Sequence, residues 1–214
     1  MDADAGERSN AQLYLTQLTD ALDVPDPQPR GSGYEFEYPV KVVEEDGTET
    51  TKAADLVREG HFLLEAKDFE EGRSNERLLR QAYGQARGYV THLPGDPPPY
   101  LMVLDVARTL IVWDRWNGTY GGFNAGRRID LTTLHENREE IALLRDIWVD
   151  PGSRNPRAKA NAVTTEIAEH LAELAASLEE RGHGHEEVAR FLIRCVFTMF
   201  AEDVGLLSRV NYPV

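Results

Sequence analysis

The run H-F-L-L-E-A-K at residues 61–67 restricts the fold more than any other part of the sequence. It follows a tight turn at residues 58–60 and is mostly apolar, which is typical of a strand in the middle of a sheet. Burial in such a strand penalises charge, yet Glu65 and Lys67 lie at its end. The run therefore predicts a sheet with a central strand, and its two charged residues need a structural or functional explanation.

The segments before this run predict one helix and two antiparallel strands. A capping-box pattern, S-x-x-Q, precedes leucines at helical spacing, so we expect a helix at residues 10–23. Apolar and charged residues alternate at residues 35–42, which is the period of a half-buried strand. An Asp-Gly hairpin signal follows and predicts that the next strand, residues 51–57, returns antiparallel.

The segments after the run predict a further helix, two or three strands and a closing helix. Helical periodicity covers residues 74–91 and ends at a run of glycine and prolines. Two apolar runs, residues 100–106 and 109–115, read as strands, and an Asn-Gly turn predicts a short return near residues 120–123. A last helix is expected at residues 134–148. This order of elements predicts an α/β fold, a mixed sheet flanked by helices.

We therefore expect a first domain at residues 1–150, followed by a linker at residues 151–157 that is rich in proline and glycine. An all-α segment, residues 158–214, comes next, with helices at residues 158–181 and 186–203. The second of these helices is apolar on nearly every side, so it must be buried, and two helices alone cannot bury it. It is expected either to dock on the first domain or to begin a helical spacer that is incomplete in this chain.

The composition indicates a soluble globular protein. The 214 residues contain no apolar run near the ~20 residues that span a bilayer, and no leader precedes the first helix, so a cytoplasmic location without membrane contact is expected. The formal net charge of −14 repels nucleic acid over most of the surface, so any DNA contact must be local or helped by other protein. The single Cys195 excludes an intramolecular disulfide and a Cys-rich zinc site.

Two carboxylates and a lysine are predicted to meet at the end of the central strand. Glu65 and Lys67 are two residues apart on a strand and face the same way, and the tight turn brings Asp55 alongside. Carboxylate oxygens, with the carbonyl of Ala66, suit Mg²⁺, and a lysine orients water and offsets phosphate charge. This set predicts metal-assisted phosphodiester hydrolysis. The spacing alone leaves a solvated strand edge or a cross-strand ion pair open as the alternative.

The following helix supports the same interpretation. Gln85 and Tyr89 lie one turn apart on the face that is predicted to point back at the sheet. Arginines recur along this helix and the residues before it, and in so acidic a chain they are candidate contacts to a phosphate backbone: Arg73, Arg77, Arg80 and Arg87. The alternative for these arginines is a solvated helix face.

The stretch A-D-L-V-R-E-G-H-F-L-L-E-A-K-D-F resembles the PD-(D/E)XK nuclease motif. In detail it is similar to the amino-terminal nuclease of MmeI-like type IIL restriction-modification enzymes, single chains that join an endonuclease, a helical spacer and an adenine DNA methyltransferase. The resemblance covers residues 13–207, because the segments YEFEYPVKV, LLRQAYGQARGYV, DLTTLHENREEIALLRDIW and VARFLIRCVFTMFAEDVGLL follow in the same order.

The resemblance implies a metal-dependent DNA endonuclease that acts on double-stranded DNA in restriction-modification or phage defence. Asp55 and Glu65 would be ligands of Mg²⁺, for which Mn²⁺ could substitute, and Lys67 would be the catalytic lysine. Gln85 and Tyr89 match a Gln-x3-Tyr feature of related nucleases and would support the site or contact DNA. Glu37 would correspond to an acidic position in the first strand.

The chain departs from the family's full pattern at the methyltransferase. It contains neither a glycine-rich S-adenosylmethionine loop nor an Asn-Pro-Pro-Tyr motif, because the D-P-P-P-Y at residues 96–100 lacks the asparagine. Methyltransferase and target-recognition modules are therefore expected in trans or in a region beyond this chain. Two other functions stay open: a non-catalytic interaction module for a partner methyltransferase, and a degenerate nuclease fold that serves as a scaffold.

Overall fold

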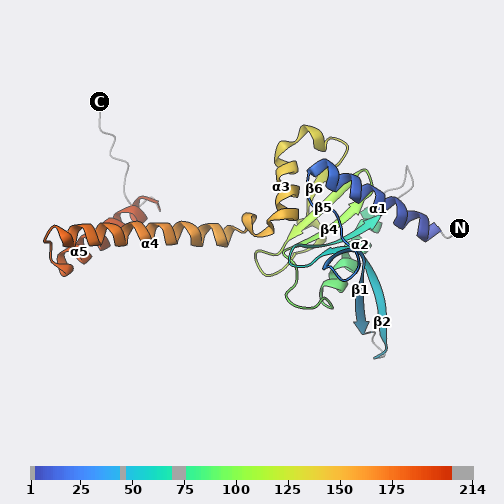
Figure 1. The fold of residues 1–214 in the computed structure, drawn as a ribbon, viewed down its shortest axis with the longest axis horizontal. Coiled ribbons are helices and arrows are strands. Elements are labelled where there is room, and N and C mark those ends of the chain that lie inside the picture. The colour runs from blue at the N-terminus through green and yellow to red at the C-terminus, as the bar shows by residue number, and fades with distance from the viewer. Residues whose placement is uncertain (1–2, 44–46, 69–75, 204–214) are drawn as a thin grey trace. The chain divides into compact units, whose positions relative to one another are not determined.

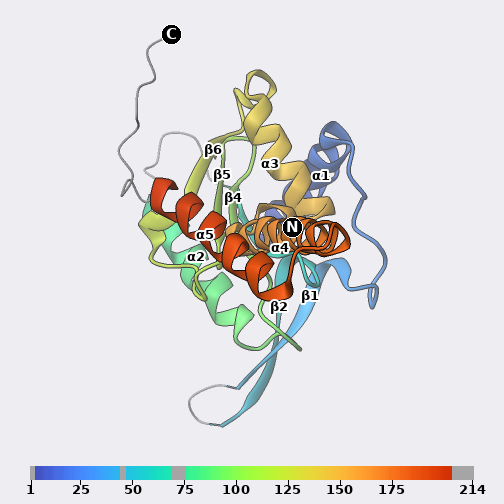
Figure 2. The ribbon, with the colours of Figure 1, turned by 90° about the vertical axis from the view of Figure 1, so that its left-hand side faces the viewer.

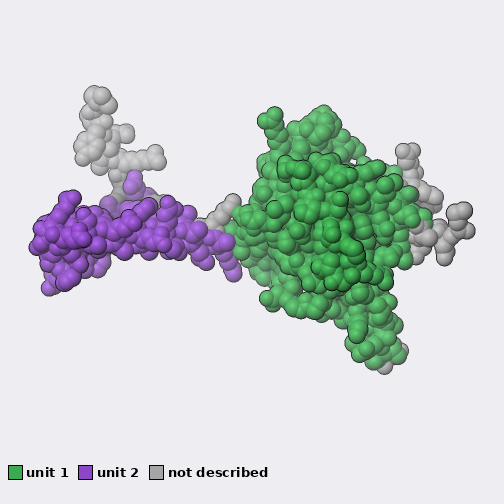
Figure 3. Space-filling view, in the orientation of Figure 1, with its two compact units in different colours: residues 1–156 green, residues 157–214 purple. Residues whose placement is uncertain are grey.

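The computed structural model describes residues 3–43, 47–68 and 76–203. The chain divides into two compact units, residues 1–156 and residues 157–214 (Figure 3). Each unit is described by itself.

A six-stranded mixed sheet forms the centre of the first unit (Figure 1). Its strand order follows the chain, and every neighbouring pair is antiparallel except β3 and β4, which are parallel. Helix α2 (Glu76–Val90) connects this parallel pair, as a parallel connection requires. The strands are β1 (Tyr34–Val43), β2 (Glu49–Arg58), β3 (Phe62–Lys67), β4 (Tyr100–Asp105), β5 (Thr109–Asp114) and β6 (Arg127–Asp130). The α/β fold class with a mixed sheet is confirmed.

Helices cover both faces of the sheet. Helix α2 packs on one face, and α1 (Ala3–Leu22) and α3 (Arg138–Val149) pack on the other (Figure 2). Side chains of β3 alternate between the two layers, since Phe62 and Leu64 join the core under α1 and α3 while Leu63 joins the core under α2. The next odd-numbered residue, Glu65, therefore faces α2.

Three aromatic side chains pack together in the core under α1 and α3. Trp148 of α3 lies 4.6 Å from Phe62 between ring centroids, and its indole Nε1 donates a hydrogen bond of 2.9 Å to the hydroxyl of Tyr34. A buried indole N–H needs such a partner, so this bond ties α3 to the start of β1. Burial raises the pKa of Tyr34 to about 12, which keeps its hydroxyl neutral.

The prediction of a short return strand at residues 120–123 is wrong. Phe123–Ala125 is a 3₁₀ helix, η1, and the sixth strand begins later, at Arg127. Gly126 explains why the strand begins later. A Cβ at this position would lie 2.5 Å from Cε2 of Trp113, so the backbone passes directly over that ring. Only Ile129 is buried in β6, so the strand carries too little apolar alternation to be predicted.

Two helix starts also differ from the predictions. Helix α1 includes Ser9 in its interior, so the expected capping box is not its beginning. Residues 134–136 form a short 3₁₀ helix, η2 (Leu134–Glu136), and α3 begins after it because the side chain of Asn137 accepts a hydrogen bond from the backbone N–H of Glu140 at 3.2 Å.

The described part of the second unit contains α4 (Pro156–Glu180), apart from its first residue, and α5 (His185–Asp203). The expected linker at residues 151–157 contains a 3₁₀ helix, η3 (Pro151–Arg154), and the first residues of α4. Among the described residues α5 exposes large apolar side chains, since Phe191, Ile193 and Phe197 are 48%, 70% and 66% exposed. No described helix is long and apolar enough to cross a bilayer.

Candidate active site

Strands β2 and β3 stop pairing at the point where the two predicted carboxylates lie. The antiparallel register runs through Val57↔Leu63 and Leu56↔Leu64 and ends there. Asp55 and Glu65 are the next residue on each strand. Opposite residues of an antiparallel pair project to the same face, so both carboxylates point toward α2.

The side chain of Asp55 accepts a backbone hydrogen bond at the point where the pairing of β2 with β3 ends. Its Oδ2 accepts a hydrogen bond of 2.7 Å from the backbone N–H of Ala66. The carboxylate thus satisfies a strand N–H that β2 would otherwise have paired. Beyond this point β2 leaves the sheet with β1 as a projecting hairpin (Figure 1), and residues 49–53 are exposed.

Glu65 is the most deeply buried member of the site. Its side chain is 2% exposed, and its Oε1 lies 3.0 Å from Nζ of Lys67, whose side chain is 28% exposed. A carboxylate that is removed from water requires a charged partner, because the energy of an isolated buried charge is very high. Lys67 supplies that partner and extends from the buried carboxylate to the solvent.

Helix α2 contributes a hydrogen-bonded pair to the opposite wall. Nε2 of Gln85 donates a 2.9 Å bond to the hydroxyl of Tyr89. Burial raises the pKa of Tyr89 above its ordinary value, the bond from Gln85 opposes this, and the negative charge of Glu65 adds to the rise. The Tyr89 hydroxyl is therefore neutral at ordinary pH and can donate a hydrogen bond to a ligand oxygen.

These side chains line one cavity of about 410 Å³. The structure brings together six of the predicted site residues around it: Glu37, Asp55, Glu65, Lys67, Gln85 and Tyr89. We call it the carboxylate cavity.

Two cationic residues of the carboxylate cavity, Arg8 and Lys52, were missed by sequence reasoning. Arg8 lies on α1, and α1 is held against the end of β3 by a 3.0 Å hydrogen bond from Nδ2 of Asn10 to Oδ2 of Asp68. No sequence signal marks this contact, because it joins segments 58 residues apart. Lys52 could have been suspected from its position on the strand that carries Asp55.

Glu37 occupies a left-handed backbone conformation at the rim of the cavity, with φ of 51°. It lies opposite Asp55, where the β1–β2 register has no pair between Phe36↔Leu56 and Tyr38↔Ala54. A non-glycine residue in such a conformation costs about 1–3 kcal/mol and is often found at functional sites. Its carboxylate lies 3.6 Å from the guanidinium of Arg30.

The arginines of α2 do not line the carboxylate cavity. Arg73 lies outside the described residues, and Arg77, Arg80 and Arg87 are exposed on the helix surface. Arg87 lies over the ring of Tyr83, 5.7 Å from its centroid.

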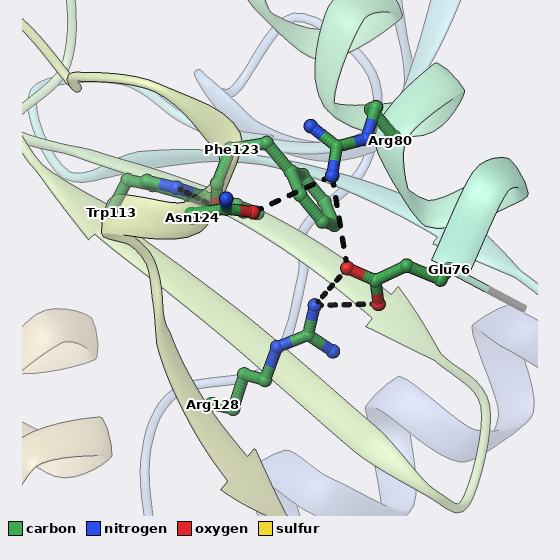
Figure 4. A network of polar contacts seen from close by, with 6 residues as sticks. All are labelled: Glu76, Arg80, Trp113, Phe123, Asn124 and Arg128. Atoms are coloured by element: carbon green, nitrogen blue, oxygen red, sulfur yellow. Dashed lines mark hydrogen bonds and ion pairs between the residues drawn. The ribbon is translucent and has the colours of Figure 1, made fainter.

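Arg80 belongs to a structural network that joins α2 to η1 and β6 (Figure 4). Its guanidinium lies 4.5 Å from the centroid of Phe123 and 3.9 Å from the carboxylate of Glu76. The same carboxylate binds Arg128 of β6 at 2.8 Å. Arg80 therefore holds the segment before β6 against α2.

The donor set of the carboxylate cavity fits Mg²⁺. This ion is usually held by one or two carboxylates and completes its shell with water and substrate phosphate, and Asp55 and Glu65 supply two carboxylates. Each carboxylate has about four lone-pair sites, so several interactions can share it. Over residues 3–43, 47–68 and 76–203 no group of three or more His, Cys, Asp or Glu is placed to hold a metal.

Comparison with known families gives two matches. Residues 2–181 match the family described as the MmeI N-terminal domain, and residues 186–212 match the MmeI helicase spacer domain. No curated protein and no solved structure matches the chain.

Proposed function

This chain belongs to the family of MmeI N-terminal domains, part of a restriction-modification enzyme, and we propose from this premise that its first unit is a metal-dependent endonuclease that hydrolyses DNA phosphodiester bonds. The observation that carries the proposal is the carboxylate cavity. Asp55, Glu65 and Lys67 line it together with the Gln85–Tyr89 pair, and Glu65 is buried in a central strand, where an isolated charge is costly.

The geometry suggests a role for each side chain. Asp55 and Glu65 would hold Mg²⁺ or Mn²⁺, which would supply positive charge to the scissile phosphate and acidify bound water. Lys67, at the border between buried carboxylate and solvent, would orient the attacking water and offset phosphate charge. The neutral hydroxyl of Tyr89, held by Gln85, would donate to a phosphate oxygen.

DNA binding by this chain alone is proposed to be weak. Its formal net charge is −14, and few cations can contact a backbone, so affinity should depend on the other modules of the enzyme. Double-stranded DNA is the proposed substrate, and methyltransferase and target-recognition modules are the proposed partners. Tight binding of the isolated chain to duplex DNA at physiological salt would contradict this.

A second candidate function is supported by α5. This helix exposes Phe191, Ile193 and Phe197, and it lies in the part that matches the MmeI spacer domain. A large exposed apolar surface marks an interaction site, so the chain could serve a partner methyltransferase without cutting DNA. Co-purification with a methyltransferase but without metal-dependent cleavage would favour this function.

Cleavage by the intact assembly tests the first proposal. Asp55→Asn and Lys67→Met are each compared with wild type in Mg²⁺ and in Mn²⁺, and both should lose at least about 100-fold in rate, as expected for loss of a metal ligand or an acid–base group. Glu166→Gln, an exposed change on α4, is the matched control and should cut like wild type. Unchanged cutting by both site variants would reject the proposal.

A further inference from the structure

A second cavity of about 400 Å³ adjoins the carboxylate cavity. One wall is the projecting β1–β2 hairpin, through Val42 and Lys52, and the other is α2. Lys52, Gln85 and Tyr89 line both cavities, so the two share a wall. We call the second one the hairpin groove.

The lining of the hairpin groove differs in charge from its neighbour. The carboxylate cavity contains three acidic residues, whereas the described lining of the groove contains none. Its polar groups are the amine of Lys52, the amide of Gln85, the hydroxyl of Tyr89 and the ring of His92. In a chain with a net charge of −14, a groove whose described lining carries no carboxylate and that adjoins a candidate catalytic site is suited to an anionic ligand.

Two glycines leave part of the α2 wall of the groove without side chains. Gly84 and Gly88 are one helical turn apart and both line it. Neither has a positive φ, and a Cβ added at either would meet no atom within 4 Å. Glycine destabilises a helix relative to alanine, so neither packing nor backbone geometry explains these residues. Bare backbone at this wall permits close approach of a ligand.

We propose that the hairpin groove holds the sugar-phosphate backbone of one DNA strand beside the scissile phosphate. This inference rests on the proposed endonuclease function. Lys52 would contact the strand between the two cavities, and Gly84 and Gly88 would let its backbone lie against α2. These contacts go to the backbone, so they position the strand without reading its sequence.

The glycines provide separate tests of stability and of function. The double variant Gly84→Ala/Gly88→Ala should raise the melting temperature of the chain by about 4–8 °C, because alanine is the better helix former. Gly88→Gln should fill the groove and lower cleavage, and low-salt binding to a short fluorescent duplex, about tenfold, a loss comparable to that of a few phosphate contacts.

Gly6→Gln is the matched control, since Gly6 lies in α1, an added Cβ there also meets nothing within 4 Å, and it lines neither cavity. It should cut and bind like wild type. Binding and cleavage by Gly88→Gln at the level of this control would overturn the groove proposal.

Cross-linking separates failure of the groove from failure of catalysis. Cys195 is the only cysteine in the sequence. In a Cys195→Ser, Lys67→Met background, a Gly88→Cys variant therefore has a single thiol, to which one photo-reactive group is attached. This chain should cross-link to a labelled duplex at low salt at least about tenfold more than the same background with Gly6→Cys. Equal cross-linking from both positions would overturn the groove proposal. If Asp55 and Lys67 proved dispensable for cutting while Gly88→Cys still cross-linked selectively, the strand would lie in the groove and the endonuclease proposal, with the groove's place beside the scissile phosphate, would fall.

Discussion

Removing the amine of Lys67 should destabilise the first unit, because Glu65 is 2% exposed and has its ion pair with this residue. Breaking a fully buried pair costs about 3–5 kcal/mol, but exposed pairs contribute only about 0–1 kcal/mol. Lys67 is 28% exposed, so water screens part of the interaction. For Lys67→Met we therefore expect a loss of about 2 kcal/mol in the free energy of unfolding.

A double-mutant cycle measures this coupling. Lys67→Met, Glu65→Gln and the double variant are unfolded in urea at pH 7 and followed by circular dichroism, with Lys41→Met as the control for loss of an exposed strand lysine. The double variant should regain most of the stability that Lys67→Met loses, since the neutral amide that replaces the carboxylate of Glu65 no longer needs a cation. It should remain unable to cut DNA.

Additive effects would refute this reasoning. If the double variant is destabilised by the sum of the single changes, within about 0.5 kcal/mol, the two side chains are not coupled and Glu65 is stabilised by other groups. A loss for Lys67→Met no larger than that of Lys41→Met would lead to the same conclusion.

Three further changes test the packing of the first unit. Gly126→Ala places a Cβ 2.5 Å from Trp113, so it should destabilise by about 1–3 kcal/mol in urea and shift the tryptophan fluorescence. Asn137→Ala removes the cap of α3 and should lower stability by about 1 kcal/mol in the same assay. The pKa of Tyr34 is raised from 10.0 to about 12, so the folded state keeps a proton that the unfolded state loses, and stability should fall as pH rises from 10 to 12. Tyr34→Phe should flatten that slope in thermal unfolding, and an unchanged slope would contradict it.

The sheet could be predicted where the sequence pattern is local. The apolar run of β3, the alternation in β1 and the turn between β2 and β3 each lie within about ten residues, and together they placed Asp55 opposite Glu65. The Gln85–Tyr89 pair followed in the same way from helical spacing.

The features that were missed depend on contacts between distant segments. β6 forms because Gly126 crosses Trp113 and Arg128 binds Glu76, 52 residues away, and not because its own residues favour a strand. Arg8 reaches the carboxylate cavity only because α1 begins before Ser9 and packs against the end of β3. The left-handed backbone of Glu37 coincides with the missing pair between Glu37 and Asp55 in the β1–β2 register and leaves no trace in residue type.

Asp55 lies where a strand edge and a candidate metal site coincide, and this limits how the chain can change over evolution. Its carboxylate accepts the N–H of Ala66, so an apolar replacement would leave that N–H without its acceptor. Asparagine would retain an acceptor oxygen while removing the negative charge. A lineage that loses the proposed metal site should therefore drift first to asparagine at this position, and such descendants would keep the fold long after the site was gone.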